Sequence, residues 1–353
     1  MNNKTTRISR SKAMFCAALL LSGGAGAQTT ITQKGAPINL DASLKGCSDS
    51  QTKCIEASGL SLSNNGNTLW TVNDANDFTQ YKMQLDGSRN SGTFSPTSAD
   101  GDIQLRTADF EGVTYACRSG DDCSKNHFIY VVDEKLNAII PMEYHDKTYF
   151  DYKKIGDMSG AMDLLPDEEV FGICRKVSLQ DCLDNPADGK HNSGLEGITY
   201  SPVHNSFFVL KEKHPGLLIR VSADLNRVEQ VWAMDLGQNA DYSGIAFDPS
   251  RCKRSDDCKI WVISDEAEKV YLLNLSDWSI DNETTIKSCH IVASQALGHK
   301  CSEGVAYDAK AKRLYIATDG GKGGHKCGFT TDKDDKTFDH SYLFTYEVKD
   351  SSH

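Results

Sequence analysis

The chain has 353 residues, of which 39% are hydrophobic, and a formal net charge of −11. Such an acidic chain is poorly suited to bind nucleic acid or an anionic membrane surface, because both depend on clustered lysine and arginine. It is better suited to bind cations, although an acidic surface also serves solubility alone. Beyond the N-terminal region, no segment approaches the roughly 18 apolar residues of a transmembrane helix.

The N-terminal segment has the three parts of a secretory signal peptide. An apolar run spans residues 13–21, and Ala25-Gly26-Ala27 supplies small residues at a cleavage site. The basic residues ahead of the run are Lys4, Arg7, Arg10 and Lys12. We therefore predict a signal peptide over residues 1–27 and one exported domain over residues 28–353, periplasmic or secreted. Cleavage removes four basic and no acidic residues, which lowers the net charge from −11 to −15.

One phrase recurs five times along the chain. Each copy has an acid or serine, a glycine, an aliphatic, a small and a large apolar residue; a turn follows, then an apolar strand ending in Asp, Glu or Lys. The motif glycines are Gly59, Gly112, Gly197, Gly244 and Gly304. Repeats of about 40–50 residues built from short strands are typical of propeller blades. The pattern predicts an all-β fold, a five-bladed β-propeller with one repeat per blade.

The ends of the chain and one long interval complicate this pattern. The last copy ends at Val348, which leaves no room for its fourth strand, whereas residues 36–44 alternate like a strand and belong to no copy. We expect this N-terminal strand to close the ring and cover an exposed edge. The interval from Gly112 to Gly197 also holds extra residues near 157–193. An insertion is favoured there; a degenerate sixth blade is the alternative.

The cysteines predict local disulfides. Export makes disulfides plausible, and without Cys16 eleven of the twelve cysteines remain. No CxxC knuckle is present, so structural zinc is not expected. The expected pairs are Cys47–Cys54, Cys117–Cys123, Cys174–Cys182 and Cys252–Cys258, with one of Cys289, Cys301 and Cys327 left unpaired. Two of these pairs stand in near-identical segments, "CRSGDDC" and "CKRSDDC", in equivalent turns.

Acidic residues occur at both ends of the recurring phrase. In a propeller the innermost strands line a central channel, so the residue before each motif glycine should lie near one mouth. Carboxylates that converge there repel each other unless a positive charge sits among them, and hard oxygen ligands favour Ca²⁺. Solvated loop acids are the simpler alternative. The candidate metal ligands are Glu111, Glu196, Glu303, Asp133, Glu134, Glu212, Asp265 and Glu266.

The phrases "DFEGVTY", "SGLEGITYSP", "DYSGIAFDP" and "SEGVAYD" resemble those of the SdiA-regulated (YjiK-like) bacterial proteins, which are distant relatives of NHL-repeat propellers. The resemblance covers about residues 55–320. It implies a five-bladed propeller with a bound calcium ion and no established activity. The stapled turns, the insertion at residues 157–193 and a glycine-rich, acidic C-terminal loop depart from the family.

Three functions remain open at this stage. The first is a calcium-stabilised binding module for a small anionic ligand or a protein partner at the acidic mouth. The second is a metal-dependent hydrolase of phosphate or other esters or lactones, as among phytase-like and lactonase-like propellers. Lys211, Lys213 and His214 would then bind anionic groups. The third is a protein-interaction scaffold with structural calcium. The fold alone does not choose among them.

Overall fold

The computed structural model describes 29–40, 56–63, 66, 68–73, 80–84, 93–94, 97–98, 109–117, 128–143, 148–149, 152–160, 179–184, 194–213, 215–237, 240–252, 258–275, 285–319 and 340–350. The expected signal peptide and the expected disulfides of Cys47 and Cys54 lie outside these residues, as do Cys123, Cys174, Cys327 and His214.

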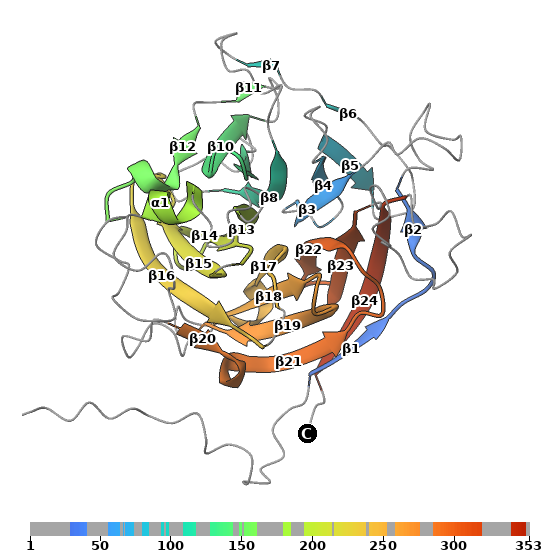
Figure 1. The fold of residues 1–353 in the computed structure, drawn as a ribbon. Helices are drawn as coiled ribbons and strands as arrows, with labels where there is room; N and C mark the ends of the chain where they lie inside the picture. The colour runs from blue at the N-terminus through green and yellow to red at the C-terminus, as the bar shows by residue number, and fades with distance from the viewer. Residues whose placement is uncertain are drawn as a thin grey trace, which may run out of the picture.

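The described strands form five hydrogen-bonded sheets, and each sheet begins with one copy of the recurring phrase (Figure 1). In the first two sheets the strands pair antiparallel, except at the outer edge of the second sheet, where two short strands pair in parallel. The first contains β3 (Ala57–Leu62), β4 (Thr68–Asn73), β5 (Gln80–Gln84) and β6 (Thr93–Phe94). The second contains β8 (Phe110–Ala116), β9 (Phe128–Asp133), β10 (Ala138–Glu143), β11 (Thr148–Tyr149), β7 (Thr97–Ser98) and β12 (Lys153–Lys154).

The remaining three sheets exchange strands at their outer edges. The third contains β13 (Leu195–Ser201), β14 (Ser206–Lys211), β15 (Leu217–Ser222), β16 (Val228–Asp235) and β20 (Thr285–Lys287). The fourth contains β17 (Gly244–Asp248), β18 (Lys259–Ser264), β19 (Lys269–Asn274) and β21 (Ile291–Ala296). The fifth contains β22 (Ser302–Asp308), β23 (Arg313–Thr318), β24 (Tyr342–Asp350), β1 (Thr29–Gln33) and β2 (Ile38–Asn39).

The inner strands approach one another so closely that only glycine fits at the motif position. A Cβ atom added at Gly59 would lie 2.6 Å from the Cα atom of Gly112, and one at Gly112 would lie 2.9 Å from that of Gly197. A Cβ atom added at Gly197 would lie 3.3 Å from the Cα atom of Gly244. A Cβ atom at Gly244 would meet the carbonyl oxygen of Glu303 at 2.8 Å, and one at Gly304 would meet the carbonyl carbon of Gly59 at 2.8 Å. The glycines of β3, β8, β13, β17 and β22 therefore adjoin one another in a cycle around the centre (Figure 1).

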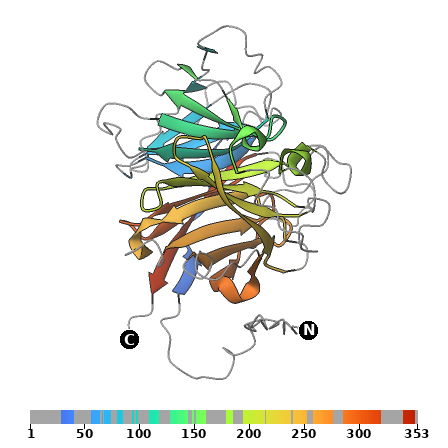
Figure 2. The same cartoon turned by 90° about the vertical axis from the view of Figure 1, so that its left-hand side faces the viewer.

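The hydrophobic core lies between adjacent sheets. The second strands are buried on both faces, as in β14, where all six residues are buried. Their Phe, Val, Ile and Leu side chains pack against the neighbouring sheets on either side, which explains their nearly continuous apolar runs. Figure 2 shows the sheets in side view, each strongly twisted, as expected for β-structure of L-residues. The all-β class and the propeller arrangement predicted from the repeats are confirmed.

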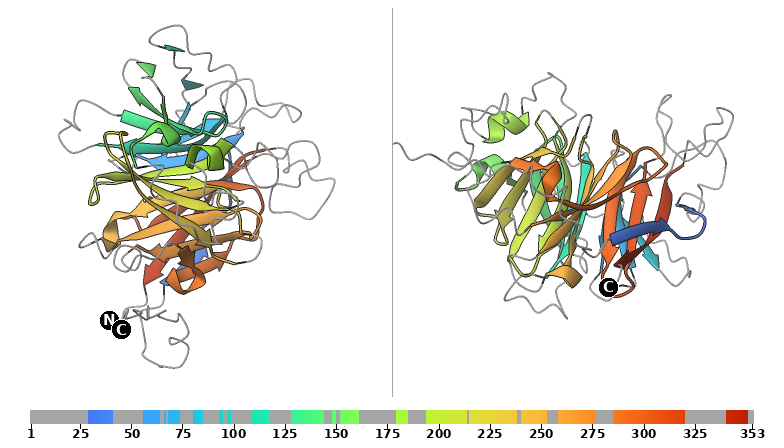
Figure 3. Two further views of the ribbon diagram at one scale, coloured as in Figure 1. Left: turned by 60° about the vertical axis from the view of Figure 1, so that its left-hand side comes forward. Right: turned by 90° about the horizontal axis from the view of Figure 1, so that it is seen from below.

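The N-terminal pairing differs in position from the prediction. β1 pairs antiparallel with β24 from Thr29 opposite Asp350 to Gln33 opposite Tyr346, and Figure 3 shows it running along that edge. In the described part of the predicted segment 36–44, Ile38 and Asn39 pair with β24. The sequence "TTITQ" has a single apolar residue, so the alternation that identifies a half-buried strand is missing there.

Only part of the predicted insertion at 157–193 is described. Its helix α1 (Leu179–Asp184) buries Leu179, Cys182 and Leu183 in a core cluster with residues of the second and third sheets. Three 3₁₀ segments complete the described elements: η4 (Ile155–Asp157), η6 (Pro249–Arg251) and η8 (Ser288–His290). No sixth sheet occurs among the described strands, and no described helix is long and apolar enough to cross a membrane.

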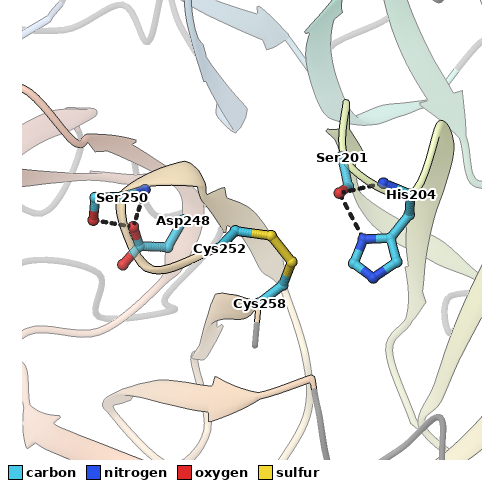
Figure 4. Close-up of a disulfide and its surroundings, with 6 residues drawn as sticks. All are labelled: Ser201, His204, Asp248, Ser250, Cys252 and Cys258. Carbon is cyan, nitrogen blue, oxygen red and sulfur yellow. Dashed lines mark hydrogen bonds between the residues drawn. A yellow bond between two sulfur atoms is a disulfide. The ribbon is translucent and has the colours of Figure 1, made fainter. Parts of the chain in front are cut away.

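The disulfide expected between Cys252 and Cys258 is present, with a Cα–Cα distance of 4.1 Å. It closes the turn that leads from β17 and η6 to β18 (Figure 4). Cys117 and Cys182 are also disulfide-bonded. Cys301, one of the three cysteines without a predicted partner, is disulfide-bonded as well.

Candidate functional site

The acid of each Glu-Gly motif sits at an irregularity in its strand pair. The register shifts between Phe110 and Gly112, between Leu195 and Gly197 and between Ser302 and Gly304. In each case the skipped residue is the motif glutamate. Such β-bulges turn a side chain out of its regular direction and are frequent beside functional sites. The chain therefore turns three glutamates out of the regular strand pattern at one end of the inner strands.

Five acidic residues from the second and third sheets form two overlapping groups. Carboxylate oxygens of Glu134, Glu196 and Glu212 all lie within 4.8 Å of one another. Oxygens of Asp109, Glu111 and Glu134 satisfy the same condition. Glu134 belongs to both groups, so the five carboxylates make one continuous cluster, here called the acidic cluster.

Backbone donors hold the acidic cluster only in part. Glu134 Oε1 accepts a hydrogen bond of 2.8 Å from the backbone N–H of Gly194. Asp133, next in the chain, accepts one of 2.9 Å from the backbone N–H of Leu136 through Oδ1. Asp133 Oδ2 and Glu212 Oε2 are buried and have no hydrogen-bond partner. A buried carboxylate oxygen without a partner is costly, so these atoms are suited to accept a ligand.

A second set of acids lies beside this cluster on the fourth and fifth sheets. Glu303 interacts electrostatically with Asp265, Asp319, Asp241 and Glu212. Asp265 Oδ1 accepts hydrogen bonds from the backbone N–H groups of Cys301 and Ser302. These contacts join β22 to the end of β18, and Glu212 links the second set to the acidic cluster.

Sequence reasoning missed Asp109 and Asp241, which belong to the same mouth. Asp241 Oδ1 accepts hydrogen bonds of 2.8 Å from Ser264 Oγ and 2.9 Å from the backbone N–H of Glu266. Asp109 and Asp241 each stand two residues before the motif acid or serine, in "DFEGVTY" and "DYSGIAF". The buried Glu56 occupies the same position in "EASGL". This shared position in the repeat is the sequence signal that could have identified Asp109 and Asp241.

Burial and mutual repulsion raise the pKa of these carboxyl groups. Burial first, then the nearby Glu111, Glu134, Glu212 and Glu303, raise the pKa of Glu196 well above its usual value. Burial chiefly raises the pKa of Glu212 to about 7 and that of Asp265 to about 6. Glu212 is therefore partly protonated near neutral pH unless a cation compensates the negative charge around it.

The predicted cationic residues are engaged within the protein. Lys211 is fully buried and donates a hydrogen bond of 2.5 Å to the backbone carbonyl of Lys213. Lys213 forms ion pairs with Glu212 at 2.5 Å and with Glu266 at 3.2 Å. The side chain of Glu266 is 49% exposed, so Glu266 lies at the rim rather than inside the cluster.

The donor set fits calcium. Every ligand in the two groups of three is a carboxylate oxygen, and Ca²⁺ takes six to eight oxygen ligands in flexible geometry. Zinc would instead favour nitrogen and sulfur donors. Glu134, Glu196 and Glu212 are the residues that would hold the ion, and the unpartnered oxygen of Glu212 supports this assignment.

We expect the stability of the calcium-free protein to fall as pH rises from about 5 to about 7. The carboxyl groups of Glu212 and Asp265 have pKa values raised to about 7 and about 6. The folded state therefore binds more protons than the unfolded state in this window, and deprotonation destabilises it. Urea unfolding in a chelator at several pH values measures the effect, which saturating calcium should reduce. A flat or rising stability without calcium would contradict the assignment.

Comparison with known protein families gives one match. Residues 180–318 match the SdiA-regulated family. The resemblance drawn from the recurring phrases is thus confirmed over the third, fourth and fifth sheets. This span includes Glu196, Glu212 and Glu303 of the mouth, whereas Asp109, Glu111 and Glu134 precede it. A search of curated proteins finds no match.

Solved propeller structures are similar only at a distance. A luciferin-regenerating enzyme has 10% identity and a TM-score of 0.44, covering 91% of this chain and 97% of its own. Glutaminyl cyclase from Myxococcus xanthus has 8% identity and a TM-score of 0.46, covering 92% and 98%. The aldose sugar dehydrogenase from Streptomyces coelicolor, in its PQQ-bound form, has 13% identity and a TM-score of 0.43, covering 92% and 99%. These values carry no argument about activity.

Proposed function

We propose that this SdiA-regulated propeller is an exported calcium-binding protein whose acidic mouth binds a ligand or partner. The observation that carries the proposal is the convergence of Glu134, Glu196 and Glu212, whose carboxylate oxygens lie within 4.8 Å of one another. Like charges at this spacing repel strongly in a buried site. A divalent cation would remove that repulsion and fix the second and third sheets relative to each other.

We further propose that the ring has five blades and that the N-terminal strand closes it. The cyclic approach of the five motif glycines supports five blades. The pairing of β1 with β24 supports closure, because β1 supplies an outer strand that the last copy lacks. The two strands lie near opposite ends of the sequence and side by side in the structure.

Substituting the buried side chain of β1 tests this closure. We expect Ile31→Asp to lower the free energy of unfolding by about 2–4 kcal/mol, because it buries a charge in place of an apolar side chain. Ile31 is 6% exposed and packs with residues of the fourth and fifth sheets. The matched control is Thr30→Asp, since Thr30 is an exposed neighbour in the same strand. Equal denaturation midpoints for the two variants would argue against closure.

Export is supported by the charge and apolar pattern of residues 1–27 and by the disulfide between Cys252 and Cys258. Cleavage after Ala27 would leave β1 almost at the new N-terminus, since β1 begins at Thr29. Mass spectrometry of the exported protein should find a chain that begins near Gln28. An intact N-terminus in the exported form would refute this.

A binding role is favoured over hydrolysis by the two lysines at the mouth. Both ammonium groups contact the protein itself, so neither is placed to receive an anionic substrate. A hydrolase would require the ion to polarise an ester oxygen or activate a water. Screening generic phosphoesters and lactones with and without calcium distinguishes the two. We expect no turnover; calcium-dependent turnover that Glu196→Gln abolishes would establish the hydrolase instead.

A further inference from the structure

A cavity of about 850 Å³ lies at the other end of the inner strands from the acidic cluster. The acids precede the motif glycines, whereas the cavity lining follows them, as in Thr114 and Tyr115 after Gly112. Four residues of strand separate Glu111 from Tyr115, which corresponds to about 13 Å. The volume is in the range of small-molecule sites. The cavity is thus a second site, distinct from the acidic cluster.

The lining is polar on one side and apolar on the other. The residue two places after each motif glycine lines the cavity in all five inner strands. In the first three copies this residue carries a hydroxyl group, and in the last two it is alanine: Ser61, Thr114, Thr199, Ala246 and Ala306. Because the inner strands adjoin in this order, the hydroxyl groups form one arc and the methyl groups the opposite arc.

In the polar arc, the hydroxyl groups of Ser61 and Thr199 are available as donors, whereas Thr114 Oγ1 donates a hydrogen bond of 3.5 Å to the backbone carbonyl of Tyr115. Ser61 Oγ accepts a hydrogen bond of 2.8 Å from the backbone N–H of Tyr115. Thr199 Oγ1 accepts one of 2.9 Å from the backbone N–H of Phe247. These bonds use the oxygens as acceptors, and a hydroxyl group also carries one donor. The two protons remain to be donated to a ligand oxygen.

The lining offers almost no net charge to a ligand. Among the described residues that line it, Asp308 carries the only carboxylate and Lys310 the only ammonium group. Asp308 Oδ1 accepts hydrogen bonds of 2.9 Å from the backbone N–H groups of Lys310 and Ala311 and is committed to that turn. Lys310 is exposed. A charged ligand would lose hydration here and gain at most a solvent-screened partner.

The chain beside the cavity is held in place before any ligand arrives. Pro249 lines the cavity and stands three residues before the Cys252–Cys258 disulfide, which closes the next turn (Figure 4). Next to Pro249, Asp248 Oδ1 accepts hydrogen bonds from the backbone N–H and the hydroxyl group of Ser250. A preformed site binds with a smaller ordering cost than a flexible one.

We propose that this cavity binds an uncharged, amphiphilic small molecule. Oxygen atoms along one edge of the ligand would accept hydrogen bonds from Ser61 and Thr199, and a hydroxyl group of the ligand would donate one to Thr114 Oγ1. The opposite, hydrocarbon edge would pack against Ala246 and Ala306. Because the cavity shares no residue with the acidic cluster, binding should not require calcium, and this proposal can fail independently of the proposed function.

A matched pair of probes tests the charge requirement. Phenyl β-glucoside carries hydroxyl groups and an apolar ring, and phenyl β-glucuronide differs from it by a carboxylate. Ligand-observed NMR and calorimetry with the disulfide-intact protein in a chelator should detect glucoside binding at millimolar concentration. The glucuronide should bind at least tenfold more weakly. No binding of the glucoside, or equal binding of both probes, would overturn the proposal.

Two variants locate the binding. Ala246→Phe fills the apolar arc and should abolish glucoside binding, whereas Val292→Phe adds a ring at an exposed position of β21 and should leave it unchanged. Thr114→Val keeps the size and shape of the side chain, so it tests the cavity even if Ala246→Phe fails to fold. It should weaken binding about three- to tenfold by removing one hydroxyl acceptor. Unchanged affinity in folded Ala246→Phe, or in Thr114→Val, would place the probe elsewhere and overturn the proposal.

Discussion

Replacing Gly59 by alanine is expected to destabilise the protein by several kcal/mol. The added Cβ atom would lie 2.6 Å from the Cα atom of Gly112, 2.6 Å from the amide nitrogen of Val113 and 2.9 Å from the carbonyl oxygen of Glu111. All three atoms belong to backbone in the middle of β8, so no side chain can rotate to relieve the contact. The two inner strands must separate instead, which disturbs the core packing on both sides of them.

The other motif glycines provide a graded series for the same experiment. At Gly197 the nearest atom to an added Cβ is 3.1 Å away and belongs to the side chain of Ile245. Gly197→Ala should therefore cost less than Gly59→Ala. At Gly35 nothing lies within 4 Å, but the residue has a φ of +71°, so alanine there should cost only about 1 kcal/mol from backbone strain. Denaturant midpoints measure the series, and equal losses at Gly59 and Gly35 would contradict close approach of the inner strands.

Much of this architecture can be predicted from the chain. The recurring glycine followed by alternating small and large residues identifies the inner strands, and their number matches the five sheets. The apolar second strands are equally recognisable because they are buried on both faces. Local sequence did not identify β1, since "TTITQ" buries only Ile31. Its position depends on the open edge of β24, which is distant in sequence.

The candidate site was predictable in composition but not in geometry. The Glu-Gly motifs identify Glu111, Glu196 and Glu303 by their repetition. The β-bulges that turn these side chains out of the regular pattern arise where the inner strands crowd together, which no single copy reveals. The acidic cluster also combines acids from both ends of the phrase, and which of them meet depends on how neighbouring sheets pack. Glu266 accordingly lies at the rim, and Asp109 joins the cluster.

Glu196→Gln is expected to reduce sharply the stabilisation that calcium gives. Glu196 is 7% exposed and lies among like charges, which together with burial raise its pKa. Without calcium near pH 7.5, a neutral amide of almost the same volume relieves this repulsion, so the variant should be at least as stable as the wild type. With calcium, the wild type gains about 2.7 kcal/mol at a hundredfold excess over the dissociation constant. The variant, lacking one ligand charge, should gain much less.

A control substitution separates this effect from a general loss of charge. Glu347 lies on β24, pairs with Lys34 and Lys349 at the surface, and takes no part in the acidic cluster. Glu347→Gln should leave the calcium-dependent gain in melting temperature unchanged. A similar loss in both variants would indicate diffuse screening of surface charge instead of a defined site.

Isothermal titration of calcium into the chelator-treated protein tests the acidic mouth most directly. We predict saturable binding to the wild type with release of protons, because the raised pKa values leave protons on the carboxyl groups that the ion must displace. Glu196→Gln should bind at least tenfold more weakly, and Glu347→Gln should match the wild type. Absence of calcium binding to the wild type, or equal binding to wild type and Glu196→Gln, would contradict a calcium site at this mouth.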